Sequence, residues 1–366
     1  MKVTVACGGT GGHAFPGLAV AQALQKRGHE VSIWCAGRAA EEGVLRAWDG
    51  ARFSTGAKQL SVRNGLAILR AFLRCRREIR RARPDVLLAM GSYSSLPPVL
   101  AAYFSGVPVV LHEANTVPGR AVEFLSRFAR CVATSFESTA RYLPHKKVVR
   151  TGLPVRADIA QGKRFGFIPP NAFVVFVTGG SQGAHRVNEL ASAALVKMAR
   201  ALAKRGNPAQ RPLYVIHQTG RLDEGAVIAD YARAALPARV HAFESDMPDA
   251  FASADFVVAR AGASTCFELA ACGKPALLIP LPSALRNHQH GNAQAFVLAG
   301  AADEGVQAEL TADGLAHYLL AKYDRPDVLR KMGEKMSALA EPHAALRVAA
   351  LVEDVAAEAR AHTTKG

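Results

Sequence analysis

Short runs of apolar, mostly β-branched residues alternate along this chain with longer segments in which apolar residues recur every three or four positions. The first pair is Val3–Cys7 and a segment that carries Leu18 and Leu24 as far as Gly28. Pro16 stands where a proline suits the first turn of a helix, so we expect that helix to begin there. Strands and helices in alternation predict a parallel, doubly wound α/β sheet.

The same pattern predicts further strands in both halves of the chain. They are expected at Val31–Cys35, Asp85–Met90, Val107–Leu111, Cys131–Thr134, Val148–Thr151, Phe173–Val177, Tyr214–His217, Val240–Phe243, Phe256–Ala259 and Ala276–Ile279. A stretch with several Gly and Pro residues at 158–171 predicts an irregular linker. Because 366 residues exceed the usual size of one hydrophobic core, we expect two α/β domains. Three helices, at about 311–322, 327–339 and 343–361, are expected to follow, the last of them returning to brace the first domain.

Two of the predicted strands run into glycine-rich turns. Phe173–Val177 is followed by Gly179-Gly180, after which Ser181 is expected to open a helix, and Gly8–Gly12 follows Val3–Cys7. The unpaired N–H groups at a helix N-terminus and the positive end of its dipole bind anions, and glycine lets the backbone come close to phosphate. Neither turn matches the Walker A or GxGxxG pattern. An anion site and a plain strand-to-helix connector both remain open.

Polar residues follow other predicted strands at what would be the same edge of each sheet. They include the loop at 91–97 and the run His112–Asn115. His13, one residue past the first glycine turn, is either a surface histidine or a general base. Glu268, on the helix expected after the turn at 260–265, is either a partner of the helix dipole or a carboxylate that accepts both ribose hydroxyls.

Composition and charge narrow the classes of function. Forty-five Lys and Arg against 30 Asp and Glu give a formal charge of +15, which indicates an acidic partner such as nucleic acid, an anionic membrane or a phosphorylated ligand. The six cysteines are scattered without a CxxC pair, which favours reduced, structural thiols. The chain opens with Met1-Lys2 and a strand, so no signal peptide is expected. No apolar run approaches the ~20 residues of a spanning helix.

Much of the positive charge lies in one segment, Leu66–Arg83. Leu66, Leu69, Phe72 and Leu73 recur there at helical spacing among seven arginines. Three interpretations stay open: a surface helix with a solvated face, an interfacial helix on anionic lipid, and a nucleic-acid contact. No aromatic platform or known nucleic-acid module accompanies the arginines, which disfavours nucleic acid.

Seven motifs together resemble the MurG family. They are GGTGGHAFPGLAVA at 8–21, MGSYSSLP at 90–97, HEAN at 112–115, PVR at 154–156, TGGSQGA at 178–184, RAGASTCFE at 260–268 and QHGNA at 289–293. The resemblance implies a GT-B fold, with two Rossmann-like, doubly wound parallel-sheet domains facing across a cleft. It also implies a peripheral enzyme on the cytoplasmic face of the bacterial inner membrane. Such an enzyme moves GlcNAc from UDP-GlcNAc to the C4 hydroxyl of MurNAc in undecaprenyl-pyrophosphoryl-MurNAc-pentapeptide, converting lipid I to lipid II of peptidoglycan.

The resemblance also implies a division of labour between the domains. Residues 1–156 would bind the acceptor and the membrane, with a helix at about 343–366 packing back on them, and residues 157–342 would bind UDP-GlcNAc. The residues implied in donor binding are Thr10, Gly11, Gly12, Asn115, Arg156, Ser181, Gln182, Glu244, Ala263, Ser264, Thr265, Cys266, Phe267, Glu268 and Gln289. Among them Glu268 would hold the ribose hydroxyls, Arg156 and Ser181 would act near the diphosphate, and Glu244 would read uracil through its backbone. Tyr93, Ser94 and His112 would lie on the acceptor side.

The implied reaction needs a base for the acceptor hydroxyl and stabilisation of the UDP leaving group. His13 is the first candidate for the base and Glu113 the second. No Asp-x-Asp pair suits a magnesium ion, so we expect a metal-independent, inverting displacement without a cofactor. The helix N-terminus near Ser181, together with Arg156, would stabilise the developing charge.

Four positions depart from the family's usual residues. Ser92 stands in place of a second glycine, Ala114 in place of Gln or a similar residue, Leu153 in place of Asn, and Glu244 in place of an apolar residue. The alternatives are a UDP-GlcNAc 2-epimerase of the same fold, a glycosyltransferase acting on diacylglycerol, a non-catalytic nucleotide-sugar-binding protein, and an arginine-rich nucleic-acid binder. The last would account for the charge but not for the glycine turns.

Overall fold

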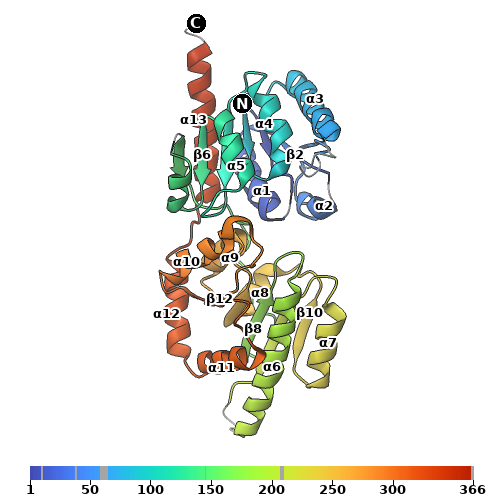
Figure 1. Ribbon diagram of the computed structural model, residues 1–366, viewed down its shortest axis with the longest axis vertical. Coiled ribbons are helices and arrows are strands. Elements are labelled where there is room, and N and C mark those ends of the chain that lie inside the picture. Colours follow the sequence, from blue (N-terminus) through green and yellow to red (C-terminus); the bar gives the residue numbers. More distant parts are fainter. Residues whose placement is uncertain (10, 38, 58–64, 145, 207–209, 364–366) are drawn as a thin grey trace. The chain divides into compact units, whose positions relative to one another are not determined.

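The chain forms two α/β units, described here from a computed structural model. The structure describes residues 1–9, 11–37, 39–57, 65–144, 146–206 and 210–363, apart from the side chains of residues 39, 40, 42, 362 and 363. The N-terminal unit comprises Met1–Arg156 and Glu341–Gly366, and the C-terminal unit comprises Ala157–Ala340. Each unit holds one fully parallel sheet with helices on both faces (Figure 1). The predicted pair of doubly wound parallel sheets is therefore confirmed.

The sheet of the N-terminal unit has seven strands in the order β3-β2-β1-β4-β5-β6-β7. The strands are β1 (Lys2–Ala6), β2 (Glu30–Cys35), β3 (Ala51–Ser54), β4 (Val86–Ala89), β5 (Val109–Glu113), β6 (Cys131–Thr134) and β7 (Lys147–Arg150). The helices are α1 (Gly11–Lys26), α2 (Ala39–Leu45), α3 (Gly65–Ala82), α4 (Leu96–Tyr103), α5 (Arg120–Leu125) and α13 (Ala344–Thr363), with short 3-10 turns at Tyr93–Ser95, Ser126–Phe128 and Glu137–Tyr142. The strand order reverses between β1 and β4, which is where such sheets bind their ligands.

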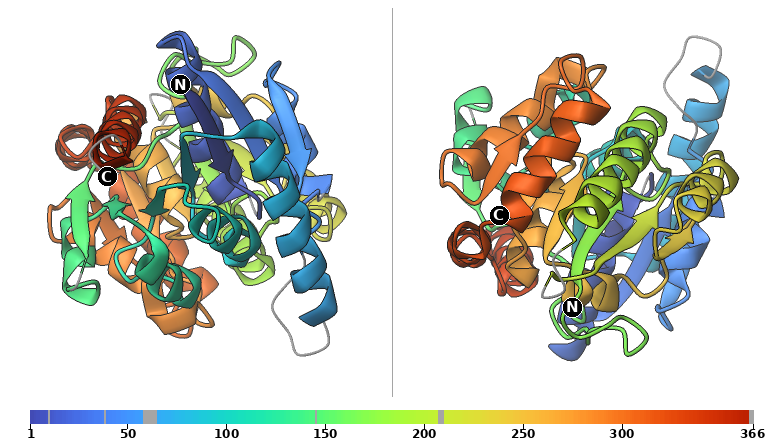
Figure 2. Two further views of the ribbon diagram at one scale, coloured as in Figure 1. Left: turned by 90° about the horizontal axis from the view of Figure 1, so that it is seen from above. Right: turned by 90° about the horizontal axis from the view of Figure 1, so that it is seen from below.

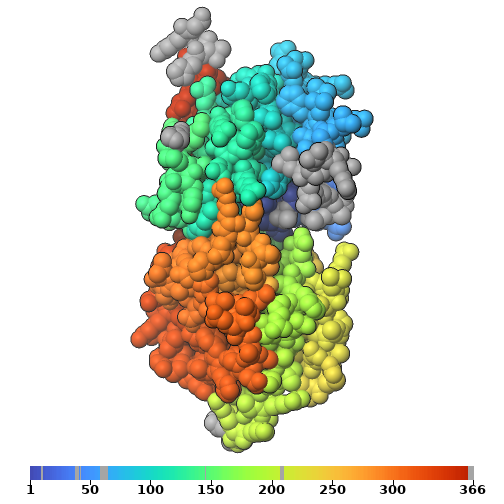
Figure 3. Space-filling model, in the orientation of Figure 1, coloured from blue at the N-terminus to red at the C-terminus, as the bar shows by residue number. Residues whose placement is uncertain are grey.

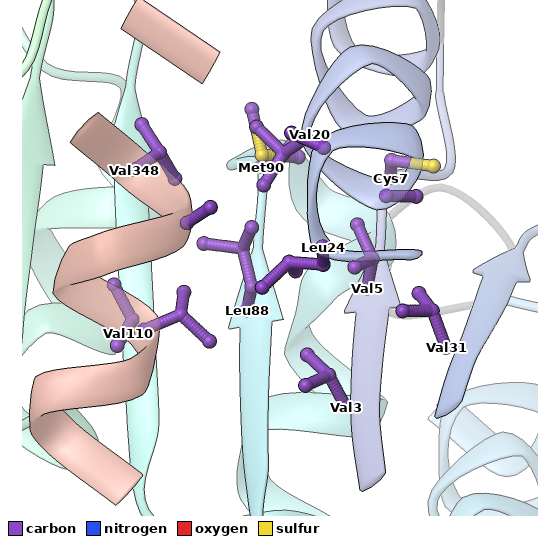
Figure 4. Close-up of a cluster of buried hydrophobic side chains, with 14 of the residues drawn as sticks. Val3, Val5, Cys7, Val20, Leu24, Val31, Leu88, Met90, Val110 and Val348 are labelled. Atoms are coloured by element: carbon purple, nitrogen blue, oxygen red, sulfur yellow. The ribbon is translucent and has the colours of Figure 1, made fainter. Parts of the chain in front are cut away.

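Two apolar layers enclose this sheet. On one face Val3, Val5 and Leu88 pack with Leu24 of α1 and with Val348 of α13, as Figure 4 shows. On the other face, α3 and α4 cover residues such as Leu87 and Leu111. The last helix of the chain is therefore part of the N-terminal core, and Figure 2 shows it nearly end on beside that sheet.

The sheet of the C-terminal unit has six strands in the order β10-β9-β8-β11-β12-β13. They are β8 (Phe173–Thr178), β9 (Leu213–Gln218), β10 (Ala238–His241), β11 (Phe256–Ala259), β12 (Ala276–Leu278) and β13 (Ala302–Glu304). The helices are α6 (His185–Arg205), α7 (Glu224–Arg233), α8 (Met247–Ser253), α9 (Ala263–Cys272), α10 (His288–Val297), α11 (Ala312–Tyr323) and α12 (Pro326–Ser337), with a 3-10 turn at Leu285–Asn287. Here the order reverses between β8 and β11. The linker at 158–171 holds no helix or strand, as predicted.

Two predicted helix starts are wrong. Helix α1 begins at Gly11, so Pro16 lies inside it, at a position where proline provides no backbone N–H. Helix α6 begins at His185 and not at Ser181. The reason is the backbone of the glycine turn, since Gly180 and Gly183 have φ values of 85° and 76° that no right-handed helix accepts.

Two predicted strands are shifted along the chain. The strand expected at Val107–Leu111 is β5, Val109–Glu113, because Pro108 lacks the N–H that a central strand must donate. His112 and Glu113 are thus the last residues of the strand and not part of the following loop. The strand expected at Val240–Phe243 is β10, Ala238–His241, whose register is set by its pairing with β9. Strands β3 and β13 lie at sheet edges and were not expected.

Candidate active site

His13 lies at the point where the order of the N-terminal sheet reverses. It is in the first turn of α1, directly after β1, and faces the loop that follows β4. A Cβ placed on Gly9 would lie 3.4 Å from its Nδ1, and one placed on Gly91 would lie 3.8 Å from its Cδ2. Burial lowers the pKa of His13 to about 4. The imidazole is therefore neutral at neutral pH and able to accept a proton.

Hydroxyl groups from the β4 loop hold the first glycine turn from one side. Ser92 Oγ donates to the carbonyl of Gly8 at 2.8 Å, and Ser94 Oγ donates to the same carbonyl at 2.5 Å. Ser92 has a φ of 73°, a conformation that glycine adopts more readily, and its Oγ caps the following turn by accepting the Ser94 N–H at 3.3 Å. The departure at Ser92 thus exchanges backbone freedom for one hydrogen bond to the first glycine turn and one within its own turn.

A carboxylate that was not predicted as a site residue, Glu41, also holds the first glycine turn. Glu41 of α2 is buried, and its Oε1 accepts the N–H of Gly9 at 2.7 Å. Its Oε2 accepts the N–H of Gly37, in the loop after β2, at 2.8 Å. Glu41 therefore ties the loops that follow β1 and β2 together, beneath the turn that carries His13.

We expect Glu41→Gln to lower kcat by about 10-fold. The amide cannot accept both N–H groups, and an unpaired buried donor costs ~1–3 kcal/mol, enough to let the turn and His13 move. Steady-state kinetics of the variant would measure this. Glu137→Gln, a change at an exposed carboxylate of the same unit, is the control. A folded Glu41→Gln protein with wild-type kcat contradicts the positioning role.

Glu113 has both carboxylate oxygens engaged by its own loop. Oε1 accepts the Asn115 N–H at 2.9 Å and Asn115 Nδ2 at 3.0 Å, and Oε2 accepts the Gly119 N–H at 3.0 Å. Three donors from its own loop therefore hold the Glu113 carboxylate in place. This arrangement favours Glu113 as the residue that shapes the loop around Asn115, and His13 as the base.

The three residues expected on the acceptor side differ in exposure. Tyr93 is exposed, at the tip of the β4 loop. Ser94 is buried, and its hydroxyl donates to the Gly8 carbonyl. His112 is only 1% exposed, its Nε2 lies 3.2 Å from the Gly152 carbonyl oxygen, and burial lowers its pKa to about 4. Of the three, only Tyr93 offers its side chain to an incoming molecule.

The remaining predicted residues of the N-terminal unit lie near the start of α1. Gly11 and Gly12 are its first two residues, whereas Thr10 lies outside the described residues. The guanidinium of Arg156 stacks 5.0 Å from the ring centroid of Phe15, two residues after His13. Phe15, which the sequence did not single out, thus orients Arg156 toward the same end of the helix.

In the C-terminal unit, the exposed side chains of Ser181 and Gln182 stand in the turn after β8. The turn presses closely on its neighbour, because a Cβ placed on Gly183 would lie 2.0 Å from the Thr219 carbonyl oxygen in the loop after β9. Only glycine fits there. Because α6 begins at His185, Ser181 does not stand at a helix N-terminus, whereas α9 begins at Ala263, soon after the neighbouring strand β11.

Helix α9 divides the six residues predicted to bind the donor into two groups. Cys266 and Phe267 are buried, and the Phe267 ring contacts Phe296 edge on at 5.9 Å. Ala263 is buried as well. Ser264, Thr265 and Glu268 are half-buried on the other side of the helix, with Ser264 and Glu268 one turn apart. Only this second group offers side chains to a ligand.

Two further predicted residues follow the neighbouring strands. Gln289, at the start of α10 and after β12, accepts the Leu281 N–H at 2.9 Å through Oε1. Glu244, after β10, is buried, and its carboxylate accepts Arg239 Nε at 2.8 Å. The Arg239 guanidinium and the Asp246 N–H hold the pKa of Glu244 below its usual range. The departure at Glu244 therefore anchors the segment through an internal ion pair.

Comparisons with known proteins bear on the whole chain. The Glycosyltransferase family 28 N-terminal domain matches residues 3–134, and the Glycosyltransferase family 28 C-terminal domain matches residues 174–348. Relatives from Myxococcus xanthus and Geobacter sulfurreducens are both 35% identical to the chain, over 97% and 98% of its length and 93% and 99% of theirs. Both are named UDP-N-acetylglucosamine–N-acetylmuramyl-(pentapeptide) pyrophosphoryl-undecaprenol N-acetylglucosamine transferase. The chain belongs to the MurG family.

Solved structures agree with that membership and define the fold. Acinetobacter baumannii MurG is 30% identical and superposes with a TM-score of 0.75, over 96% of this chain and 99% of that one. A UDP-GlcNAc 2-epimerase from Neisseria meningitidis superposes with a TM-score of 0.71 at 15% identity, which shows a common fold alone. The fold is GT-B, as the resemblance implied.

Several other expectations for this MurG-family chain concern single residues, the cysteines, membrane-spanning helices and metal sites. Leu153, where the family usually has Asn, is buried against the core. All six cysteines are free, as predicted. Among the described residues, no helix is long and apolar enough to cross a membrane, and no group of three or more His, Cys, Asp or Glu could hold a metal ion.

Proposed function

We propose that this chain transfers GlcNAc from UDP-GlcNAc to the C4 hydroxyl of MurNAc in lipid I, forming lipid II. The observation that carries the proposal is full-length identity of 35% to transferases with that activity in their names. The two switch points support it independently, because each brings a glycine turn and polar side chains to the carboxyl edge of a parallel sheet.

The chemistry follows as a single displacement with inversion. The acceptor oxygen attacks the anomeric carbon of GlcNAc, the bond from that carbon to the UDP oxygen breaks, and the acceptor proton passes to His13. A neutral imidazole is already in the form that accepts this proton. Glu113 and Glu41 keep the surrounding loops in place. Gly11, Gly12, Asn115 and Arg156 stay predictions for contacts to the sugar and diphosphate.

The donor is assigned to the C-terminal unit. The backbone N–H groups of the first turn of α9 and the positive end of its dipole would bind the diphosphate, and its cap residue Gly262 has no side chain that could compete for these groups. Ser181 and Gln182 border the same switch point, and Ser264 and Glu268 share an accessible side of α9. Glu268 would accept both ribose hydroxyls, the backbone at Glu244 would read uracil, and Gln289 would contact the donor sugar or ribose.

We expect Glu268→Ala to weaken UDP binding by ~1–3 kcal/mol, because the ribose hydroxyls lose their shared acceptor. Isothermal calorimetry with UDP measures the change. Glu334→Ala, at an exposed carboxylate of α12, is the matched control and should bind UDP as the wild type does. Unchanged UDP affinity in Glu268→Ala removes the ribose assignment. NAD should not bind to the wild type, because neither glycine turn matches the GxGxxG pattern of dinucleotide-binding proteins.

The membrane contact is assigned to the N-terminal unit, which carries most of the charge. This unit has 26 Lys and Arg against 13 Asp and Glu, a net +13, whereas the C-terminal unit has 19 against 17, a net +2. An acidic partner should therefore bind to the N-terminal unit. Lipid I carries a long polyprenyl chain, so a protein that uses it must work at a bilayer surface.

Helix α3 presents three of its leucines to the outside of the unit. Its buried face consists of Ala71, Cys75 and Ile79, whereas Leu66, Leu69 and Leu73 are 72%, 52% and 52% exposed. The exposed leucines lie among exposed arginines, and the helix forms an outer edge of its unit (Figure 3). A solvated polar helix would have the reverse arrangement. This favours the interfacial interpretation of Leu66–Arg83.

Aromatic rings continue this surface from α3 to α5. The Phe72 ring meets Phe104 edge on at 6.3 Å, and Tyr103 contacts both Phe104, at 5.4 Å, and Phe128, at 5.1 Å. Phe124 lies 5.5 Å from Phe128. Tyr103, Phe104 and Phe124 are exposed, and such rings favour the headgroup region of a bilayer. We place the chain as a peripheral protein on the cytoplasmic face of the inner membrane.

Incubation with UDP-GlcNAc, with and without lipid I, tests the proposal. Lipid II and UDP should appear only when lipid I is present. UDP-ManNAc formed without lipid I would instead indicate an epimerase, and transfer to diacylglycerol would indicate the related transferase. Binding of UDP-GlcNAc without turnover under any of these conditions would indicate a nucleotide-sugar-binding protein.

A further inference from the structure

Gln218 joins two loops of the C-terminal unit that the proposed function assigns to different parts of the nucleotide. It is the last residue of β9, paired with Thr178 of β8 on one side and with His241 of β10 on the other. Its side chain is only 3% exposed. A buried amide needs partners for both its N–H and its C=O, and both are found in backbone.

The two hydrogen bonds run in opposite directions across the carboxyl edge of the sheet. Nε2 donates to the Gly180 carbonyl, in the turn after β8, at 2.7 Å. Oε1 accepts the Glu244 N–H, in the segment after β10, at 3.3 Å. The turn is closed internally, because the Gly183 N–H donates to the same Gly180 carbonyl at 2.9 Å, and the segment after β10 is held by the Arg239–Glu244 ion pair. Gln218 is the bridge between them.

We propose that Gln218 is a positioning residue that couples recognition of the diphosphate to recognition of the base. The inference rests on the proposed function, in which the turn after β8 borders the diphosphate and the Glu244 backbone reads uracil. Its amide nitrogen bonds to one loop and its amide oxygen to the other, and the side chain is only 3% exposed, so we assign Gln218 to the spacing of the loops and not to ligand contact. It fixes the spacing of the loops, so that a nucleotide bound to one is already aligned with the other.

Calorimetry with UDP, uridine and inorganic pyrophosphate tests this coupling in the full chain. Gln218→Met keeps the volume of the side chain and removes both hydrogen bonds. We expect its affinity for UDP to fall on the order of 10-fold, with the KM for UDP-GlcNAc rising in parallel. Affinities for uridine and for pyrophosphate alone should stay within about twofold, and so should kcat at saturating donor.

Gln161→Met is the matched control, because Gln161 is exposed in the linker and its side chain donates one hydrogen bond, to the Ala157 carbonyl. Gln218→Leu replaces Gln218→Met if thermal melting shows that the methionine variant does not fold. Unchanged UDP affinity in a folded Gln218 variant overturns the inference, as does an equal loss for uridine. A wild-type chain that binds no UDP overturns the proposed function, and this inference with it.

Discussion

His13→Asn is expected to lower kcat by on the order of 10²-fold or more while leaving the affinity for UDP unchanged. The base accepts a proton in the transition state, and loss of such a group usually costs 10²–10⁴-fold, about 3–5 kcal/mol. Asparagine keeps the polarity and roughly the size of the histidine, so the turn around Gly9 keeps its packing. His13→Ala should show the same loss. Single-turnover kinetics with lipid I, together with calorimetry of UDP, separates chemistry from binding.

The pH dependence gives a second, independent check on His13. A base acts in its deprotonated form, so activity is retained above its pKa and lost as the pH falls through it. Because burial lowers the pKa of His13 to about 4, kcat/KM should stay flat from neutral pH down to about pH 5.5. An acid limb near the ordinary pKa of histidine, ~6.5, contradicts this environment.

Survival of turnover in His13→Asn would make the role of His13 structural and turn attention to Glu113. The structure specifies what a catalytic Glu113 requires, since at least one of its three N–H donors must release the carboxylate. Glu113→Gln separates the two roles. It should disturb the loop at Asn115 and raise the KM for UDP-GlcNAc if Glu113 shapes that loop, and it should abolish chemistry if Glu113 is the base.

Replacement of Arg70, Arg74 and Arg77 by Gln is expected to weaken binding to anionic vesicles by about 100-fold at low salt. Each arginine near an anionic leaflet contributes about 1 kcal/mol, so three contribute about 3 kcal/mol. Sedimentation with anionic and neutral vesicles over a range of salt measures the effect, and wild-type binding should weaken steeply with salt. The affinity for UDP should not change.

Matched controls keep this test specific to α3. The control variant replaces three exposed arginines of the C-terminal unit, Arg200, Arg325 and Arg330, with Gln. It loses the same amount of charge and should bind vesicles as the wild type does. Wild-type sedimentation of the α3 triple variant contradicts the assignment and places the contact elsewhere.

The apolar half of the surface is tested separately. Leu69→Ser with Leu73→Ser should release the protein even at low salt, because both leucines are exposed on α3. Leu222→Ser with Leu298→Ser, at leucines 97% and 83% exposed in the C-terminal unit, is the control. Phe72 is a poorer target than the sequence suggested, because it packs partly against the core beneath α3 and meets the Phe104 ring. A Phe72→Ser effect would combine loss of stability with loss of membrane contact.

The sequence predicted the architecture because the signals for it are local. Short apolar, β-branched runs such as Phe173–Val177 indicate buried strands without reference to the rest of the chain. Glycines after a strand indicate that the backbone there comes close to a neighbouring segment or a ligand. Thr311 could be expected at a helix start because its hydroxyl caps it, here by accepting the Gly314 N–H at 3.1 Å. The start of α6 could not be predicted in the same way. The backbone has positive φ at Gly180 and Gly183, so the helix begins later than the composition indicates.

The residues that hold the site were missed because their partners are set by sheet order. Glu41 and Gln218 have nothing unusual around them in the sequence. They matter because α2 brings Glu41 under the turn after β1, and because β9 lies between β8 and β10. The exposure of the α3 leucines could not be decided from the sequence for a related reason, so the interfacial interpretation stayed one of three. Periodicity shows that a helix has an apolar face but not which of its faces the sheet covers.

The stereochemistry of the product tests the central claim most directly. The purified chain would be incubated with UDP-GlcNAc labelled with 13C at C1 and with lipid I, and the labelled disaccharide lipid would be examined by NMR. An inverting displacement at the C4 hydroxyl predicts a β-linked GlcNAc, with the C1 label coupled across the glycosidic bond to C4 of MurNAc. An α-linkage, attachment at another hydroxyl, or label that stays in UDP-sugars would contradict the proposed function.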